Sequence, residues 1–132
     1  MLQPLYKLIF WLEYIAVLIT AFLALPWQLD KIRVGTLDFH IRLDHLLHLL
    51  VYFLICIYFY AGQKNGLVLF RQRALTKFLI LIFILATVTE VVQLWVPSRS
   101  FNPMDWITNI SGVIIGLVVM YLLSRRKVIG IR

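Results

Sequence analysis

The polar side chains within the apolar segments of this 132-residue chain recur at helical spacing. Asp44, His48 and Tyr52 are four residues apart, and Glu90 and Gln93 are three apart. Because residues three or four apart share a face of an α-helix, each set presents its groups together. An imidazole beside carboxylates can transfer protons, hold a divalent cation or form a structural hydrogen-bond network. These residues are therefore the first candidates for a functional site.

A third polar stripe contains two glycines. Asp105, Asn109, Gly112 and Gly116 follow one another at spacings of four, three and four residues, which again places them on one helical face. Two small residues four apart let a second helix approach closely. We therefore expect this face to pack against a neighbouring helix, with both glycines at the contact.

The beginning of the same helix carries local signals of its own. Asn102 can cap the helix, Pro103 suits its first position, and Asp105 lies in the first turn, where a carboxylate favours the free backbone amides. The connection that precedes Asn102 is short, so the third and fourth helices are predicted to form an antiparallel hairpin.

The elements that must position these groups are four long apolar stretches. The chain is 62% hydrophobic and only 14% charged, whereas a soluble domain carries about 25% charged residues. The stretches run from about Leu5 to Leu25, Leu43 to Tyr60, Ala74 to Val96 and Pro103 to Leu123. At 1.5 Å per residue each can cross a hydrocarbon core of roughly 30 Å. We predict an all-α membrane protein, a single domain over residues 1–132 with four transmembrane helices.

The first stretch is expected to remain part of the protein rather than to be a cleaved signal peptide. Its apolar run is longer than that of a typical signal peptide, Glu13 interrupts it, and no small-residue cleavage site precedes Pro26. A carboxylate facing lipid is costly, so Glu13 should face a neighbouring helix or lie near the inner interface.

The basic residues predict the orientation. With a cytoplasmic N-terminus, four basic residues lie outside and nine inside, which favours both termini in the cytoplasm. The outer four are Lys31, Arg33, Arg42 and Arg99. The inner nine are Lys7, Lys64, Arg71, Arg73, Lys77, Arg125, Arg126, Lys127 and Arg132.

Three polar side chains from different helices are predicted to lie at one depth. His48, Glu90 and Asn109 each lie six or seven residues from the predicted outer end of their helix, which is about 10 Å into the membrane. Because isolated polar groups are costly there, they should face one another. Arg99, in the short outer loop, is the expected cation for Glu90, Asp44 or Asp105. We predict one convergent site that opens outward.

The ordered set of motifs resembles the VanZ-like family of bacterial membrane proteins. The resemblance covers about residues 43–120. One difference is that His45 stands where the family usually has a lysine. The matching segments are Asp44-His-Leu-Leu-His48 with Tyr52, Glu90-Val-Val-Gln93, Pro97-Ser-Arg99-Ser-Phe and Asp105-Trp-Ile-Thr-Asn109-Ile-Ser-Gly112.

The resemblance implies a multi-pass protein of the bacterial cytoplasmic membrane with a link to teicoplanin-type glycopeptide resistance or the cell envelope. It implies no reaction. The expected partners are membrane lipids and a cell-wall precursor or polyprenyl-linked lipid. Nucleic acid is not expected, because the basic residues form short clusters between apolar runs instead of a basic helix face.

Three interpretations of the polar residues stay open. They can recognise an anionic envelope lipid or a cell-wall precursor, with Arg99 and the start of the fourth helix receiving the anion. They can catalyse a reaction of a lipid-linked substrate, with His48 as general base oriented by Asp44 or Glu90. They can also form a purely structural network that sets helix register.

Neither a metal nor a cofactor is expected. Asp44, His48 and Glu90 could share a divalent ion, but catalytic zinc sites usually use more histidine.

Overall fold

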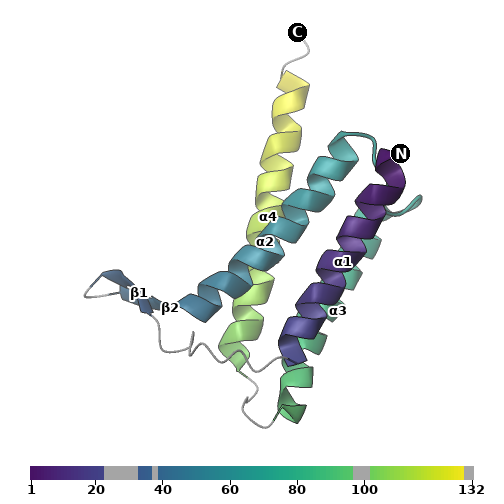
Figure 1. Cartoon of the computed structure of the whole chain (residues 1–132). Coiled ribbons are helices and arrows are strands. Elements are labelled where there is room, and N and C mark those ends of the chain that lie inside the picture. The colour runs from purple at the N-terminus through teal and green to yellow at the C-terminus, as the bar shows by residue number, and fades with distance from the viewer. Residues whose placement is uncertain (23–32, 37–38, 97–101, 130–132) are drawn as a thin grey trace.

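The chain folds into four long helices, and the computed structural model describes residues 1–22, 33–36, 39–96 and 102–129 (Figure 1). Each of the four is long and apolar enough to cross a membrane, which confirms the predicted all-α membrane fold. The helices are α1 (Leu2–Phe22), α2 (Leu43–Lys64), α3 (Ala74–Val92) and α4 (Pro103–Ile129), with a short 3-10 turn η2 (Gln93–Trp95) after α3.

The helices and the apolar stretches do not end at the same residues. α2 continues four residues past Tyr60 to Lys64, and α4 continues past Leu123 to Ile129. In contrast, α3 stops at Val92, before the predicted end at Val96, and tightens into η2. Hydropathy marks where lipid ends, whereas backbone hydrogen bonding can carry a helix on into water.

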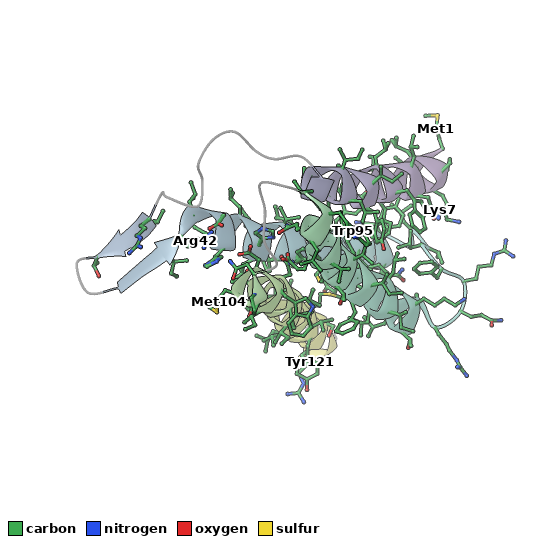
Figure 2. All side chains as sticks on the ribbon, turned by 90° about the horizontal axis from the view of Figure 1, so that it is seen from below. Met1, Lys7, Arg42, Trp95, Met104 and Tyr121 are labelled. Carbon is green, nitrogen blue, oxygen red and sulfur yellow. The ribbon has the colours of Figure 1, made fainter. Side chains whose placement is uncertain are left out.

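A short β-hairpin precedes α2, in a segment that we expected to be an outer loop. Strands β1 (Arg33–Thr36) and β2 (Phe39–Arg42) pair antiparallel, with Arg33 opposite Arg42 and Thr36 opposite Phe39. His40 belongs to β2. Both views of the molecule show the hairpin projecting away from the helices (Figures 1 and 2).

The helices alternate in direction, so the start of α1 and the end of α4 lie at the same end of the bundle (Figure 1). α3 and α4 run antiparallel, as predicted. An aromatic core joins three helices: the rings of Phe59 and Phe78 stack at 4.1 Å, and Phe10 of α1 packs on Phe78 at 6.2 Å. On the packed side of α1 the Oε2 atom of Glu13 is also buried, in agreement with the expectation that this carboxylate faces neighbouring helices.

The two glycines of α4 allow its close crossing with α2. A Cβ atom on Gly112 would lie 2.3 Å from the backbone oxygen of Leu49, and one on Gly116 would lie 2.5 Å from Cβ of Cys56. Separations this short are sterically forbidden, so only glycine permits this helix separation. The Gly112 and Gly116 face of α4 thus lies against α2. It brings Asn109, one turn before Gly112, onto the α2 side.

Candidate functional site

The starts of α2 and α4 lie side by side and carry a set of charged and polar side chains. Figure 2 shows Arg42 where β2 meets α2, near Met104 at the start of α4. Across this junction His45 Nε2 lies 2.9 Å from Asp105 Oδ1, and both side chains are largely buried. Where β2 meets α2, Arg42 binds the Asp44 carboxylate through two nitrogens, with Nε 3.1 Å from Oδ1. We call Arg42, Asp44, His45, Asn102 and Asp105 the boundary cluster.

Asn102 joins the boundary cluster to the helix backbone. Its Oδ1 accepts the backbone N–H of Met104 at 3.1 Å, which confirms Asn102 as the N-cap of α4. Its Nδ2 donates to Asp105 Oδ1 at 3.1 Å. The Asp105 carboxylate therefore accepts from both Asn102 and His45 and has little freedom to rotate.

One helical turn further along both helices, a second set of polar side chains joins three helices. Asn109 Nδ2 donates to Glu90 Oε1 at 3.1 Å, and Asn109 Oδ1 lies 2.9 Å from His48 Nδ1. An amide oxygen only accepts, so His48 Nδ1 donates in this arrangement. Glu90 and Asn109 are completely buried (0% exposed). We call Glu90, Asn109 and His48 the buried network.

Tyr52 continues the polar face of α2 by one more turn. Its hydroxyl lies 3.3 Å from Thr89 Oγ1, and Thr89 in turn donates to the carbonyl of Ala86. Because that hydrogen of Thr89 is already used, Tyr52 is the donor to Thr89. Tyr52 is 1% exposed, so this bond also lies in the packed interior.

The structure places most of the predicted site residues on one polar column along α2 and α4. His48, Glu90 and Asn109 are in contact, and Asp44 and Asp105 lie at the boundary. Gln93 is buried in η2, but its side chain joins neither set within the residues that the structure describes. Arg99 lies outside the described residues. That the column binds a ligand stays a prediction.

Each boundary carboxylate has a partner other than Arg99, whose predicted pairing lies outside the described residues and stays a prediction. We assigned Arg99 to Asp44, Asp105 or Glu90, whereas the structure pairs Asp44 with Arg42 and Asp105 with His45. Both pairs lie at the junction where α2 and α4 begin. Each carboxylate therefore has a partner there that does not come from the loop between α3 and α4.

Several residues of the column were missed by the sequence interpretation. Arg42 was treated only as a topology signal, and Asn102 only as a cap. His45 lies three residues before His48 and therefore on the same face, but the sequence left open whether its side chain lies in the site or at the membrane interface. Thr89, next to Glu90, was not considered at all. The i, i+3 spacing could have identified His45, but no sequence signal distinguished Thr89.

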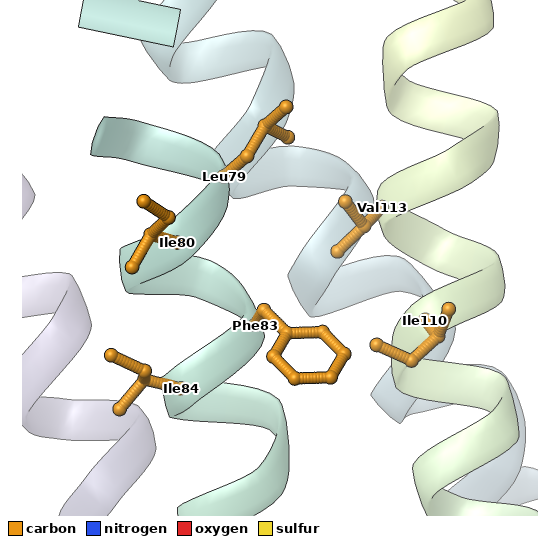
Figure 3. A pocket seen from close by; sticks show the side chains of 6 residues that line it. All are labelled: Leu79, Ile80, Phe83, Ile84, Ile110 and Val113. Carbon is orange, nitrogen blue, oxygen red and sulfur yellow. The ribbon is translucent and has the colours of Figure 1, made fainter. Parts of the chain in front are cut away.

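An apolar groove lies away from the polar column, between α3 and α4. This groove, of about 350 Å³, is lined by apolar side chains alone (Figure 3). They are Leu79, Ile80, Phe83, Ile84, Ile110 and Val113. These side chains offer no polar group that could orient a ligand, and their apolar surface suits acyl chains.

Comparison with known proteins agrees with the fold. The family model described as VanZ/LLP1 matches residues 6–124, a range that includes nearly all of α1 as well as the polar column. No curated protein and no solved structure matches the chain. The chain belongs to the VanZ/LLP1 family.

Proposed function

We propose that this multi-pass membrane protein recognises an anionic envelope lipid or a lipid-linked cell-wall precursor at the end of the bundle where α2 and α4 begin. The observation that carries the proposal is the buried network. Glu90 and Asn109 are withdrawn completely from the surface and joined to His48 across three helices. Ionisable groups at membrane depth are costly, and they generally mark functional sites.

The proposed orientation places this end of the bundle outside the cytoplasm. The start of α1 and the end of α4 lie at the opposite end of the bundle (Figure 1). The connection between α2 and α3, together with the helix turns beside it and the first and last turns of the chain, carries nine of the 13 basic residues of the sequence. Basic segments are retained in the cytoplasm, so the boundary cluster is proposed to meet the outer leaflet of a bacterial cytoplasmic membrane.

The cations and amides at this end support an anionic ligand. The outer segments contain Lys31, Arg33, Arg42 and Arg99. The start of α4 adds backbone N–H groups and the positive end of a helix dipole, which attract phosphate and carboxylate groups. Arg99 is the proposed ligand cation, since Arg42 already grips Asp44. The family resemblance adds the setting, a link to the cell envelope and teicoplanin-type resistance.

The test removes one cation at each end of the molecule. Arg99→Gln should weaken retention of anionic or polyprenyl-phosphate lipid during purification, detected by native mass spectrometry, and should reduce teicoplanin tolerance in an expressing strain. Lys64→Gln, which removes a cation at the opposite end of α2, is the matched control and should change neither. If Arg99→Gln is as abundant in the membrane as the wild type and retains lipid equally, recognition through Arg99 is wrong.

A second candidate function is turnover of a lipid-linked substrate. The observation in its favour is that Asn109, itself held by Glu90, orients the His48 imidazole from its Nδ1 side, as a general base requires. In that case His48→Ala abolishes turnover of a polyprenyl-phosphate substrate while lipid binding persists. If His48→Ala and Asn109 variants only reduce the amount of folded protein, the purely structural interpretation of the network is favoured.

A further inference from the structure

We propose that Asp44, His45 and Asp105 form a binding site for a divalent transition-metal ion such as Mn²⁺ or Zn²⁺ at the membrane boundary. One carboxylate oxygen of each aspartate and one imidazole nitrogen all lie within 4.8 Å of one another. Ligand atoms about 2.0–2.2 Å from a shared ion are roughly 3–4 Å apart. Only a small inward movement of these side chains is needed to complete a three-ligand shell.

The donor types define the class of ion. One imidazole nitrogen with two carboxylate oxygens is a mixed donor set, suited to Zn²⁺, Mn²⁺ or Fe²⁺ and less suited to Mg²⁺ or Ca²⁺, which prefer oxygen alone. His45 directs its Nε2 toward Asp105 Oδ1 at 2.9 Å. In the ion-free molecule a proton on that nitrogen bridges the pair, and the metal ion takes the place of that proton.

Two of the three ligands already have outer-shell partners that orient them. Asn102 donates to Asp105 at 3.1 Å, and Arg42 together with the backbone N–H of His45 holds the carboxylate of Asp44. Such partners are typical of metal sites, where they fix ligand orientation. They leave lone pairs on each carboxylate, because an ionised carboxylate has about four acceptor positions.

The position in the fold allows an ion to enter. Asp44 and His45 are half-buried in the first turn of α2, whereas Asp105 is 6% exposed, at the start of α4. The site therefore opens toward the aqueous boundary on one side and is closed by the helices on the other. An ion held here would join the starts of α2 and α4. The sequence alone combined Asp44 with His48 and Glu90, and it led us to expect no metal because catalytic zinc sites usually use more histidine.

The proposal does not depend on the function proposed above, and its test uses the metal alone. The full-length protein in detergent, stripped of metal with a chelator, is titrated with Mn²⁺ and the free ion is followed by EPR. We expect about one tightly bound ion per chain and a nitrogen coupling in the pulsed EPR spectrum, because His45 supplies a ligand nitrogen. Bound Mn²⁺ should also raise the unfolding temperature of the protein.

Three variants separate ligation from folding. Asp44→Asn leaves the His45–Asp105 pair in place, so it should fold normally, yet it should weaken Mn²⁺ binding by roughly tenfold or more. His45→Asn should also remove the nitrogen coupling. His40→Asn, which removes the histidine of β2 instead, is the matched control and should bind Mn²⁺ like the wild type. The proposal is wrong if the wild type binds Mn²⁺ no more strongly than Asp44→Asn does. It is also wrong if the wild-type complex shows no nitrogen coupling.

Discussion

The boundary cluster and the buried network lie one helical turn apart along α2 and α4, and the buried network also includes Glu90 of α3, yet the two are built differently. The boundary cluster consists of charged pairs, Arg42 with Asp44 and His45 with Asp105, and the Arg42 side chain is 35% exposed. In the buried network the amide of Asn109 joins the His48 imidazole to the Glu90 carboxyl group. Glu90 and Asn109 are completely buried. The buried network therefore lies deeper within the fold than the boundary cluster.

The difference follows from the dielectric environment. Near water, charges are screened and a pair contributes little to stability. In the interior each polar atom needs a partner, because leaving it without one costs the full desolvation penalty. We therefore expect the boundary cluster to tolerate change and to serve binding, and the buried network to be sensitive to any substitution. The four predictions below test this contrast.

Gly112→Val should have the largest effect, because it separates the two helices that carry both regions. Any Cβ there meets the Leu49 backbone oxygen at 2.3 Å, and backbone cannot move aside as a side chain can. We expect a loss of at least about 3 kcal/mol in the free energy of unfolding, measured by unfolding in mixed micelles. Ile115→Val, on the exposed side of α4, is the control, and equal losses in the two variants would contradict the close crossing.

Asn109→Leu should come next, since it removes both hydrogen bonds of the buried network and leaves Glu90 and His48 without their shared partner. Hydrogen bonds between membrane helices contribute roughly 0.6 kcal/mol each on average. One of the two bonds joins groups that are completely buried, where a lost hydrogen bond costs more than the average, so we expect a loss of about 2 kcal/mol. The same unfolding measurement on Asn65→Ala, at the exposed C-cap of α2, should give a much smaller loss; a matching loss would remove the distinction between the regions.

Asp105→Asn tests the boundary cluster in the presence of a chelator. It replaces the charged partner of His45 but retains a hydrogen-bonding side chain, so we expect a loss of about 1 kcal/mol, smaller than that of Asn109→Leu. Salt should shrink the difference from the wild type, since at about 1 M ionic strength charges are screened within roughly 3 Å. A loss as large as that of Asn109→Leu, unaffected by salt, would show that the cluster behaves as buried interior.

Tyr52→Phe should have the smallest effect. It removes only the hydroxyl that donates to Thr89 at 3.3 Å, and Thr89 retains its bond to the Ala86 carbonyl. We expect a loss of roughly 0.5 kcal/mol, seen as a small decrease in unfolding temperature. Thr89→Val should act similarly, and the double variant should lose little more than either single one, because both remove the same bond.

Much of this arrangement could be predicted from local sequence. Apolar length identified all four helices, and Asn102 with Pro103 identified the start of α4, because these signals depend on neighbouring residues and on the thickness of lipid. The spacing of Asp44, His48, Asp105 and Asn109 placed them correctly on their helix faces. The β-hairpin of residues 33–36 and 39–42 was missed, since short strands outside the membrane have only weak sequence signals.

Sequence alone thus determined the membrane class, the four helices and the polar face of each, because periodicity and hydropathy are properties of single segments. Only the tertiary structure decided which groups meet. It joined His45 to Asp105 and placed Asn109 between His48 and Glu90. These partners are 19 to 61 residues apart in the chain. The crossing of α2 and α4 at Gly112 and Gly116 determines their rotation about the helix axes, and no local pattern specifies that angle.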